Sequence, residues 1–253
     1  MTKILMYGCG GHMGHVICDL IKDMGNVEVG AGVDVQAGEQ REFPVFSSLD
    51  EVNVEVDAII DFSAAPAVDA VLAYAADRQI PLVECTTGLS EEQLAYLEEC
   101  SKKTAILRSA NMSLGINTLL KMVQTAAKVL GEAGFDIDIV EKHHRRKLDA
   151  PSGTALALAD SINEASDGKY QYVFDRSGRR MQRPADEIGI SAVRGGTIVG
   201  EHEIIFAGTD EVIEFKHTAY SRAVFGKGAI EAAIYLAGKP AGLYDMSDVI
   251  DGK

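Results

Sequence analysis

The sequence predicts an α/β protein of two domains. The first is expected to be a parallel sheet with helices on both faces, and the second an α+β unit built on a mixed sheet. Short, fully apolar runs alternate with helix-periodic segments through the first half of the chain. Strands without polar alternation are typical of parallel sheets, because both of their faces are buried. Three strand-like runs then follow one another from residue 188 onward, as in antiparallel or mixed sheets.

The first half predicts five strands and three helices. Residues 12–24 show helical spacing of apolar side chains, and Ser90 stands where it would cap a helix. The strands are expected at 3–10, 27–34, 56–63, 80–88 and 104–112, and the helices at 12–24, 66–78 and 90–103.

The second half begins with a long apolar-periodic helix, Leu114 to Leu130, and ends with a helix that resembles the first half in style. The remaining elements are strands at 135–144, 188–196, 199–208 and 210–220 and helices at 152–165 and 226–238. We therefore expect two domains, one of residues 1–113 plus 223–253 and one of residues 114–222. Joints for domain closure are expected near 112–114 and 221–225.

Composition indicates an ordinary globular protein with an acidic surface. The 253 residues carry a formal net charge of −14, which argues against binding to nucleic acid or to an anionic membrane. The four cysteines have no CxxC spacing, so reduced thiols are expected rather than disulfides or a zinc site. The first apolar run is too short for a signal peptide, and we expect a cytoplasmic protein with no membrane contact.

A glycine-rich stretch, GCGGHMG, follows the first predicted strand and opens the first helix. Glycines there permit a tight turn and let backbone N–H groups approach a pyrophosphate. The spacing departs from G-x-G-x-x-G, and a glycine-rich turn without a ligand is the alternative. Asp34, 20 residues beyond Gly14, ends the second strand, where a carboxylate binds a ribose 2′-hydroxyl and repels a 2′-phosphate. The pattern favours NAD(H), with NADPH possible if Arg41 reaches the site.

Three later strands end in polar motifs. They are DFS at 61–63, CTTG at 85–88 and SANM at 109–112. Open α/β sheets hold their ligands at the carboxyl ends of the strands, so these motifs are expected beside the cofactor.

The stretch EKHHRRKLDAPSGTA, residues 141–155, concentrates positive charge before a helix start. Pro151 and the capping types Ser152 and Thr154 predict free N–H groups that bind a carboxylate or phosphate. A small dianion fits, with Arg146 or Lys147 as a second partner and His143 or His144 as a proton-transfer group. The alternatives are a solvated charged face, a nucleic-acid patch or a histidine metal pair. Adjacent strand residues point to opposite faces, so no metal is expected.

These motifs together resemble the dihydrodipicolinate reductases of bacterial lysine biosynthesis. The resemblance covers nearly the whole chain and includes GCGGHMG, DFS, TTG, SANMSLGIN, the basic stretch, VRGGTIVGEHEIIFAG and HTAYSRAVFGKGA. It implies that 1–113 plus 223–253 form a Rossmann-type dinucleotide-binding domain and that 114–222 form a substrate-binding and oligomerisation domain. It also implies a homotetramer built through the sheet of the second domain. It also implies reduction of 4-hydroxy-tetrahydrodipicolinate, with loss of water, to tetrahydrodipicolinate in the diaminopimelate route.

The resemblance also implies roles for single residues. His143 and Lys147 would be catalytic, and His144, Gly153 and Thr154 would bind the substrate carboxylates. The cofactor-binding residues would be Gly8, Cys9, Gly10, Gly11, His12, Met13, Asp34, Phe62, Cys85, Thr86, Thr87, Ser109, Ala110, Asn111 and Met112.

The sequence departs from the family pattern at three of its positions. His12 stands where many members carry Arg or Lys, and Val35 where some carry Arg. Both cations can hold a 2′-phosphate, so the departures favour NADH. Cys85 replaces a glycine that is common before the Thr-Thr pair. An amino-acid or sugar dehydrogenase, or an NAD-sensing regulator, would share the glycine loop without needing the basic stretch.

Overall fold

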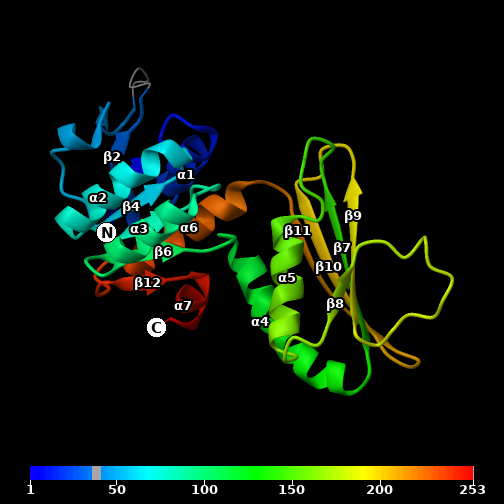
Figure 1. Cartoon of the computed structure of the whole chain (residues 1–253). Coiled ribbons are helices and arrows are strands. Elements are labelled where there is room, and N and C mark those ends of the chain that lie inside the picture. The colour runs from blue at the N-terminus through cyan, green and yellow to red at the C-terminus, as the bar shows by residue number, and fades with distance from the viewer. Residues whose placement is uncertain (36–40, 253) are drawn as a thin grey trace. The chain divides into compact units, whose positions relative to one another are not determined.

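The computed structural model describes residues 1–35 and 41–252, and its chain forms two compact units (Figure 1). Unit 1 comprises Met1–Leu114 and Ala223–Lys253, and unit 2 comprises Gly115–Arg222. The sequence predicts these divisions after residues 113 and 222. The C-terminal segment therefore returns to the unit in which the chain begins.

Unit 1 is built on a seven-stranded sheet in the order β12-β6-β5-β4-β1-β2-β3. All of its strand pairs are parallel. The strands are β1 (Thr2–Tyr7), β2 (Val27–Val33), β3 (Val45–Phe46), β4 (Ala58–Asp61), β5 (Leu82–Glu84), β6 (Ala105–Arg108) and β12 (Gly242–Tyr244).

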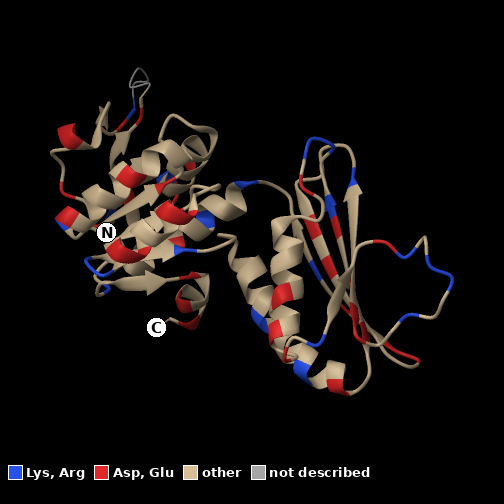
Figure 2. Cartoon of the chain, in the orientation of Figure 1, with Lys and Arg blue, Asp and Glu red and all other residues tan. Residues whose placement is uncertain are grey.

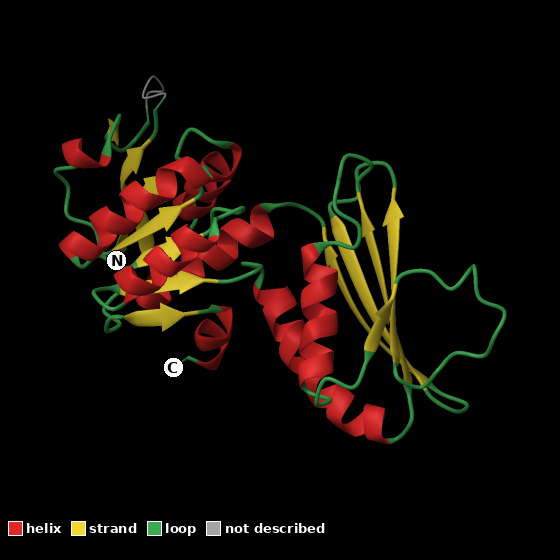
Figure 3. Cartoon of the chain, in the orientation of Figure 1, coloured by secondary structure: helices red, strands yellow, loops and turns green. Residues whose placement is uncertain are grey.

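Helices cover both faces of this sheet (Figure 3). One core packs the sheet against α1 (His12–Lys22) and α6 (Ala223–Leu236), and the other packs it against α2 (Val68–Arg78) and α3 (Glu91–Ser101). Ser90 caps α3 as expected, because its hydroxyl accepts from Gln93 N–H while the Gln93 side chain accepts from Ser90 N–H. Short helices complete the unit: η1 (Leu49–Glu51), η2 (Ala65–Ala67) and α7 (Met246–Asp251).

Unit 2 has a five-stranded mixed sheet in the order β11-β10-β7-β9-β8. Strand β10 (Gly200–Ala207) is antiparallel to β7 (Asp136–His143) and β11 (Val212–Ala219), whereas β9 (Glu187–Arg194) is parallel to β7 and β8 (Gln171–Val173). Helices α4 (Leu114–Glu132) and α5 (Gly153–Glu164) pack with one face of this sheet in a third core. The predicted fold class is confirmed.

The sequence missed the short strands β3, β8 and β12 and the short helix α7. Segments of two to six residues are too short to display a period of apolar side chains, so only tertiary pairing reveals them. The predicted strands at 56–63 and 80–88 end earlier than expected, at Asp61 and Glu84, which leaves their polar motifs in loops.

Helix α6 lies tightly against the loop that follows β6. A Cβ added at Gly228 would stand 1.7 Å from the Met112 carbonyl oxygen, whereas one added at Gly25 would meet nothing within 4 Å. Gly228→Ala is expected to lower the free energy of unfolding by about 2 to 3 kcal/mol, because backbone cannot yield as a side chain can. Denaturant titration measures this, with Gly25→Ala as the control. Equal stability of the two variants would contradict the close packing.

Candidate active site

The glycine loop between β1 and α1 has the shape of a pyrophosphate cradle. Gly8 has φ +80°, and a Cβ on it would lie 2.8 Å from the Phe62 carbonyl oxygen. A Cβ on Gly14 would lie 2.4 Å from the Gly8 carbonyl oxygen, so the turn excludes any side chain there. Gly11 is the N-cap of α1 and offers no capping side chain, and His12 and Met13 form the first turn. The N–H groups of this helix start therefore suit an anion.

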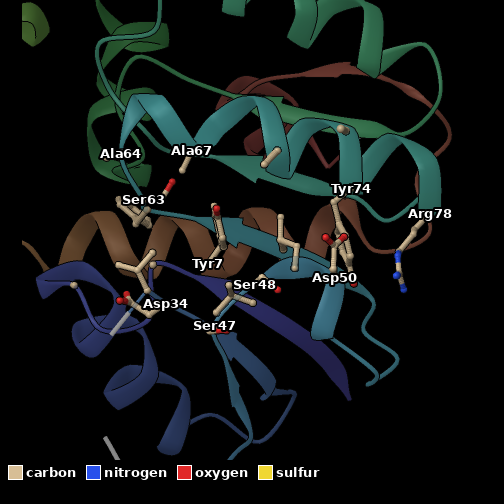
Figure 4. A pocket seen from close by; sticks show the side chains of 18 of the residues that line it. Tyr7, Asp34, Ser47, Ser48, Asp50, Ser63, Ala64, Ala67, Tyr74 and Arg78 are labelled. Carbon is tan, nitrogen blue, oxygen red and sulfur yellow. The ribbon is translucent and has the colours of Figure 1, made fainter. Parts of the chain in front are cut away.

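Asp34 follows β2 and faces this loop, where its Oδ2 accepts the Gly10 N–H at 2.9 Å. Asp34 lines a pocket of about 880 Å³, and Figure 4 shows its side chain among those around the cavity. Four of the predicted cofactor residues line the pocket, namely Gly8, Gly11, Asp34 and Phe62. A carboxylate at this place in a pocket suits a ribose hydroxyl.

The sequence missed much of this pocket. Its wall includes Ser47 and Ser48 after β3 and runs from Ala64, just before η2, to Arg78 at the end of α2. Strand β3 has two residues, so no alternation marked its carboxyl end. The alanines of α2 did not indicate a binding site in the sequence. They contribute to the pocket only through the small size of an apolar side chain.

The other predicted cofactor residues stand at neighbouring strand ends. Cys85, Thr86 and Thr87 follow β5, and Ser109, Ala110, Asn111 and Met112 follow β6. Three loops are turned in the same way, by a side-chain oxygen that accepts the N–H two residues later. Asp61 accepts from Ser63 at 2.7 Å, Glu84 from Thr86 at 2.7 Å and Asn111 from Ser113 at 2.8 Å. Because β4, β5 and β6 are parallel, these loops lie at the same edge of the sheet.

Arg41 lies beside the glycine loop. Its Nη2 donates to the Cys9 carbonyl oxygen at 2.9 Å and lies 3.0 Å from His15 Nε2. Cys9 itself is buried, and burial raises its thiol pKa to about 11. Arg41 thus stabilises the glycine loop by binding a backbone carbonyl oxygen of that loop.

In unit 2 a buried carboxylate organises the predicted catalytic region. Glu141 is fully buried on β7, where its oxygens accept from Arg194 at 2.6 and 2.7 Å and from the Ser152 N–H at 2.9 Å. His143 Nδ1 lies 2.7 Å from Glu141 Oε2. Strand register places these groups together, because Arg194 on β9 pairs with His143 and His202 on β10 pairs with Glu141.

The charges in this network fix the state of His143. Burial raises the Glu141 pKa, but hydrogen bonds from Arg194, His143 and Ser152 outweigh it, so the pKa is lowered and the group is ionised. Burial lowers the His143 pKa against the opposing effect of Glu141, so the imidazole is neutral near pH 7. An ionised Glu141 only accepts, and His143 therefore carries its proton on Nδ1 and leaves Nε2 as an acceptor.

Helix α5 begins beside this network. Ser152 is its N-cap, with Oγ accepting from the Ala155 N–H at 3.2 Å and lying 3.0 Å from His202 Nε2. Thr154, expected as a capping type, lies inside the helix. Burial lowers the His202 pKa to about 4, and its ring meets that of His143 edge-on at 5.2 Å. Both rings are thus held neutral.

The loop from His144 to Pro151 carries the predicted cations, seen in blue after β7 in Figure 2. Lys147 Nζ lies 3.0 Å from Asp149 Oδ2, and the Asp149 pKa is lowered by Lys147 and by the Gly153 N–H. The groups predicted to bind a substrate carboxylate therefore hold a carboxylate of the chain itself. His144 Nδ1 is buried and, among the residues that the structure describes, has no hydrogen-bond partner.

No group of three or more His, Cys, Asp or Glu side chains suited to a metal ion occurs within 1–35 and 41–252. Over the same residues, no helix has the length and apolar character needed to span a bilayer.

A parallel sheet with a glycine cradle, joined in one chain to a unit with a neutral imidazole beside a helix start, is typical of an oxidoreductase of the Rossmann type. Solved structures share this fold. A dipicolinate-bound dihydrodipicolinate reductase from Paenisporosarcina sp. TG-14 matches 97% of both chains with TM-score 0.81 at 24% identity. Scyllo-inositol dehydrogenase from Lactobacillus casei, with NAD(H) and scyllo-inositol bound, matches 100% of this chain and 94% of its own with TM-score 0.58 at 12% identity.

Sequence comparison identifies the family. The profile described as dihydrodipicolinate reductase, N-terminus, matches residues 2–112, and the one for the C-terminus matches 115–250. Proteins named 4-hydroxy-tetrahydrodipicolinate reductase from Caldanaerobacter subterraneus subsp. tengcongensis and Clostridium tetani are 54% and 45% identical, each over 99% of this chain and 98% of its own. The chain belongs to the dihydrodipicolinate reductase family, whose members are NAD(P)H-dependent oxidoreductases.

Replacing Glu141 by Gln tests the electrostatic role of the buried carboxylate. Glu141 opposes the lowering of the His143 pKa by burial, so its loss is expected to lower that pKa further. An NMR titration of the imidazole measures the shift. Glu201→Gln is the matched control, because Glu201 pairs with Lys142 and Lys216. A His143 pKa that moves equally in both variants would contradict the specific contact.

Proposed function

We propose that this chain reduces 4-hydroxy-tetrahydrodipicolinate to tetrahydrodipicolinate, with loss of water, in the diaminopimelate route to lysine. The observation that carries the proposal is the second unit's cluster of a neutral His143, the Lys147 ammonium and the N-terminus of α5, in a chain of this family. A small dicarboxylate is the ligand that such a set of groups suits.

The cofactor would lie on the glycine loop of unit 1. Gly8, Gly10 and Gly11 would approach its pyrophosphate, with Cys9, His12 and Met13 completing the loop. Asp34 would accept a ribose 2′-hydroxyl, and Phe62, Cys85–Thr87 and Ser109–Met112 would border the remainder. When bound, the nicotinamide supplies the hydride. We favour NADH, because Asp34 repels a 2′-phosphate while His12 and the exposed Val35 offer no strong cation.

The substrate carboxylates would replace Asp149 on its present partners. Gly153 and Thr154 would donate their backbone N–H groups, Lys147 its ammonium, and His144 an imidazole nitrogen. Displacement of a flexible, half-exposed side chain costs little, because Asp149 then regains water. The internal carboxylate thus marks where a substrate carboxylate would sit.

His143 or Lys147 would supply the proton that balances the hydride. His143 is neutral before substrate binds, with an acceptor at Nε2. A bound dianion raises the pKa of a nearby imidazole, so substrate itself would favour the protonated donor. Glu141 would stabilise the imidazolium through Nδ1, and Lys147 would supply a second cation.

We also propose a cytoplasmic homotetramer. The four cysteines are free, as a reducing compartment requires. The sheet of unit 2 has α4 and α5 on one face, and Val193 and Val212 are exposed on the other face (Figure 1). Such a sheet suits pairing with a second copy. Sedimentation velocity measures the assembly.

The first experiment is NADH oxidation with freshly prepared condensation product of pyruvate and aspartate semialdehyde, and NADPH in parallel. Turnover with NADH favoured would support the reaction and the role of Asp34.

In Asp34→Ala we expect the preference for NADH over NADPH to fall by roughly tenfold, since the repulsion of the 2′-phosphate is lost. Equal selectivity of wild type and variant would remove Asp34 from cofactor choice. Bound NADH without turnover would favour a regulator instead.

Two substitutions separate proton transfer from binding. His143→Ala is expected to lower kcat by roughly 10²- to 10⁴-fold with little change in substrate KM, because the imidazole moves a proton. Lys147→Ala should lower kcat and raise KM, because the ammonium also binds a carboxylate. Steady-state kinetics measures both, with the exposed Arg145→Ala as the control. An unchanged kcat in His143→Ala would exclude it from the chemistry.

A further inference from the structure

Two buried carboxyl groups lie side by side in unit 1, outside the predicted site residues. Asp61 ends β4 and Glu84 ends β5, and the two strands pair these residues in register. Their exposed fractions are 0% and 1%. Paired residues of neighbouring strands direct their side chains to the same face. That face is the one covered by α2, because Ile59 and Leu82, two residues earlier, pack with Val71 of α2.

Each carboxyl uses one oxygen to turn the loop that follows it. Asp61 Oδ1 accepts the Ser63 N–H at 2.7 Å, and Glu84 Oε1 accepts the Thr86 N–H at 2.7 Å. The other oxygens, Asp61 Oδ2 and Glu84 Oε2, are buried and have no hydrogen-bond partner among the described residues. Two ionised carboxylates cannot satisfy each other, because neither has a proton to donate.

The neighbouring strands bring no compensating charge into this place. Tyr7 of β1 stands opposite Asp61, and its pKa is raised by burial and then by Asp61 and Asp34. Arg108 of β6 stands opposite Glu84 in register, but its side chain is exposed. Burial is the main cause of the raised pKa of both carboxyls. No cation is among the groups that chiefly affect either pKa.

The helices packed on these strands bring no compensating charge to the two carboxyls either. Asp69, in the first turn of α2, accepts from Gln93 of α3. Helix α6 contacts β4 and β5 in the other core, on the opposite face of the sheet, and carries Lys227 and Glu231. Burying a second negative charge beside the first is therefore uncompensated, which one retained proton avoids.

We propose that Asp61 and Glu84 share one proton and that this protonated pair positions the two cofactor loops that follow β4 and β5. Glu84 holds the proton, and Asp61 is the ionised partner, whose Oδ1 accepts the Ser63 N–H. Burial, and next the Asp61 charge, raises the Glu84 pKa to about 9, so the proton is retained at neutral pH. Both residues are positioning residues, since each acts through its loop.

Loss of the proton places two charges in contact beneath both loops. Dinucleotide binding therefore weakens as pH rises through about 9, and this inference rests on the proposed function in placing the cofactor at these loops. Folding stability is expected to change with pH in the same direction as dinucleotide binding. Glu84 has a pKa of 4.5 when unfolded, so the folded chain retains a proton that the unfolded chain loses, and stability falls between pH 4.5 and about 9.

The test compares wild type with Glu84→Gln, which donates a hydrogen bond to Asp61 at every pH. NADH binding, followed by calorimetry, is expected to weaken about tenfold in wild type between pH 8 and pH 10, and less than about twofold in the variant. The thermal midpoint of Glu84→Gln should likewise fall less steeply with pH. Glu84→Ala, which leaves the Thr86 N–H without its acceptor, should bind NADH more weakly than Glu84→Gln at pH 7.

Asp175→Asn is the matched control. Asp175 also accepts the N–H two residues later, from Ser177 at 2.8 Å, but it lies on an exposed loop of unit 2. The Asp175→Asn variant should keep the wild-type pH dependence of NADH binding. An equal loss of NADH affinity at alkaline pH in wild type and in Glu84→Gln would overturn the inference.

Infrared spectroscopy separates this inference from the proposed function. A protonated carboxyl stretch should be present in wild type at pH 7, disappear by pH 10 and be absent from Glu84→Gln. If the stretch is present but NADH does not bind, the cofactor site fails and the shared proton stands. If the stretch is absent at pH 7, the shared proton is refuted whatever the activity.

Discussion

A fully buried carboxylate, that of Glu141, is the group on which the architecture of the second unit depends. It neutralises Arg194, orients His143 and receives the N–H of Ser152 at the start of α5. A buried charge is tolerated only when its partners surround it, so these elements are tied to one another. Strand register brings these groups together, and the contacts with Glu141 then fix the start of α5 and the tautomer of His143.

The first unit solves a related problem by a different route. Its pair of buried carboxyls has no arginine among its main electrostatic partners, and a retained proton takes the place of the cation. The two units therefore hold buried acids in opposite ionisation states. Glu141 is ionised because Arg194 outweighs burial, whereas Glu84 is protonated because burial is reinforced by Asp61.

The basic stretch gains its meaning from what surrounds it. Six neighbouring basic or imidazole residues in an acidic chain have several explanations when read alone. In the folded unit Lys147 and the Gly153 N–H converge on one carboxylate, that of Asp149. The convergence of a cation and a helix N-terminus on a carboxylate of the chain itself favours recognition of a small anion over a solvated face.

The sequence by itself determined the fold class, the order of the long elements and the family. Apolar runs and helical periodicity depend on burial, and burial acts along whole elements such as β1 and α4. The capping of α3 by Ser90 was equally local. Glycines at positions 8 and 14 were readable because a turn without room for a Cβ restricts residue type.

Only the tertiary structure decided which distant residues meet. The contacts of Glu141 with Arg194 and of Ser152 with His202 join residues about fifty positions apart, through register that no single strand encodes. The pairing of Asp61 with Glu84 likewise depends on strand order. The alanine wall of the pocket and the two-residue strand β3 carry no pattern of their own. Ionisation states followed last, because a pKa depends on burial and neighbours that exist only in the folded chain.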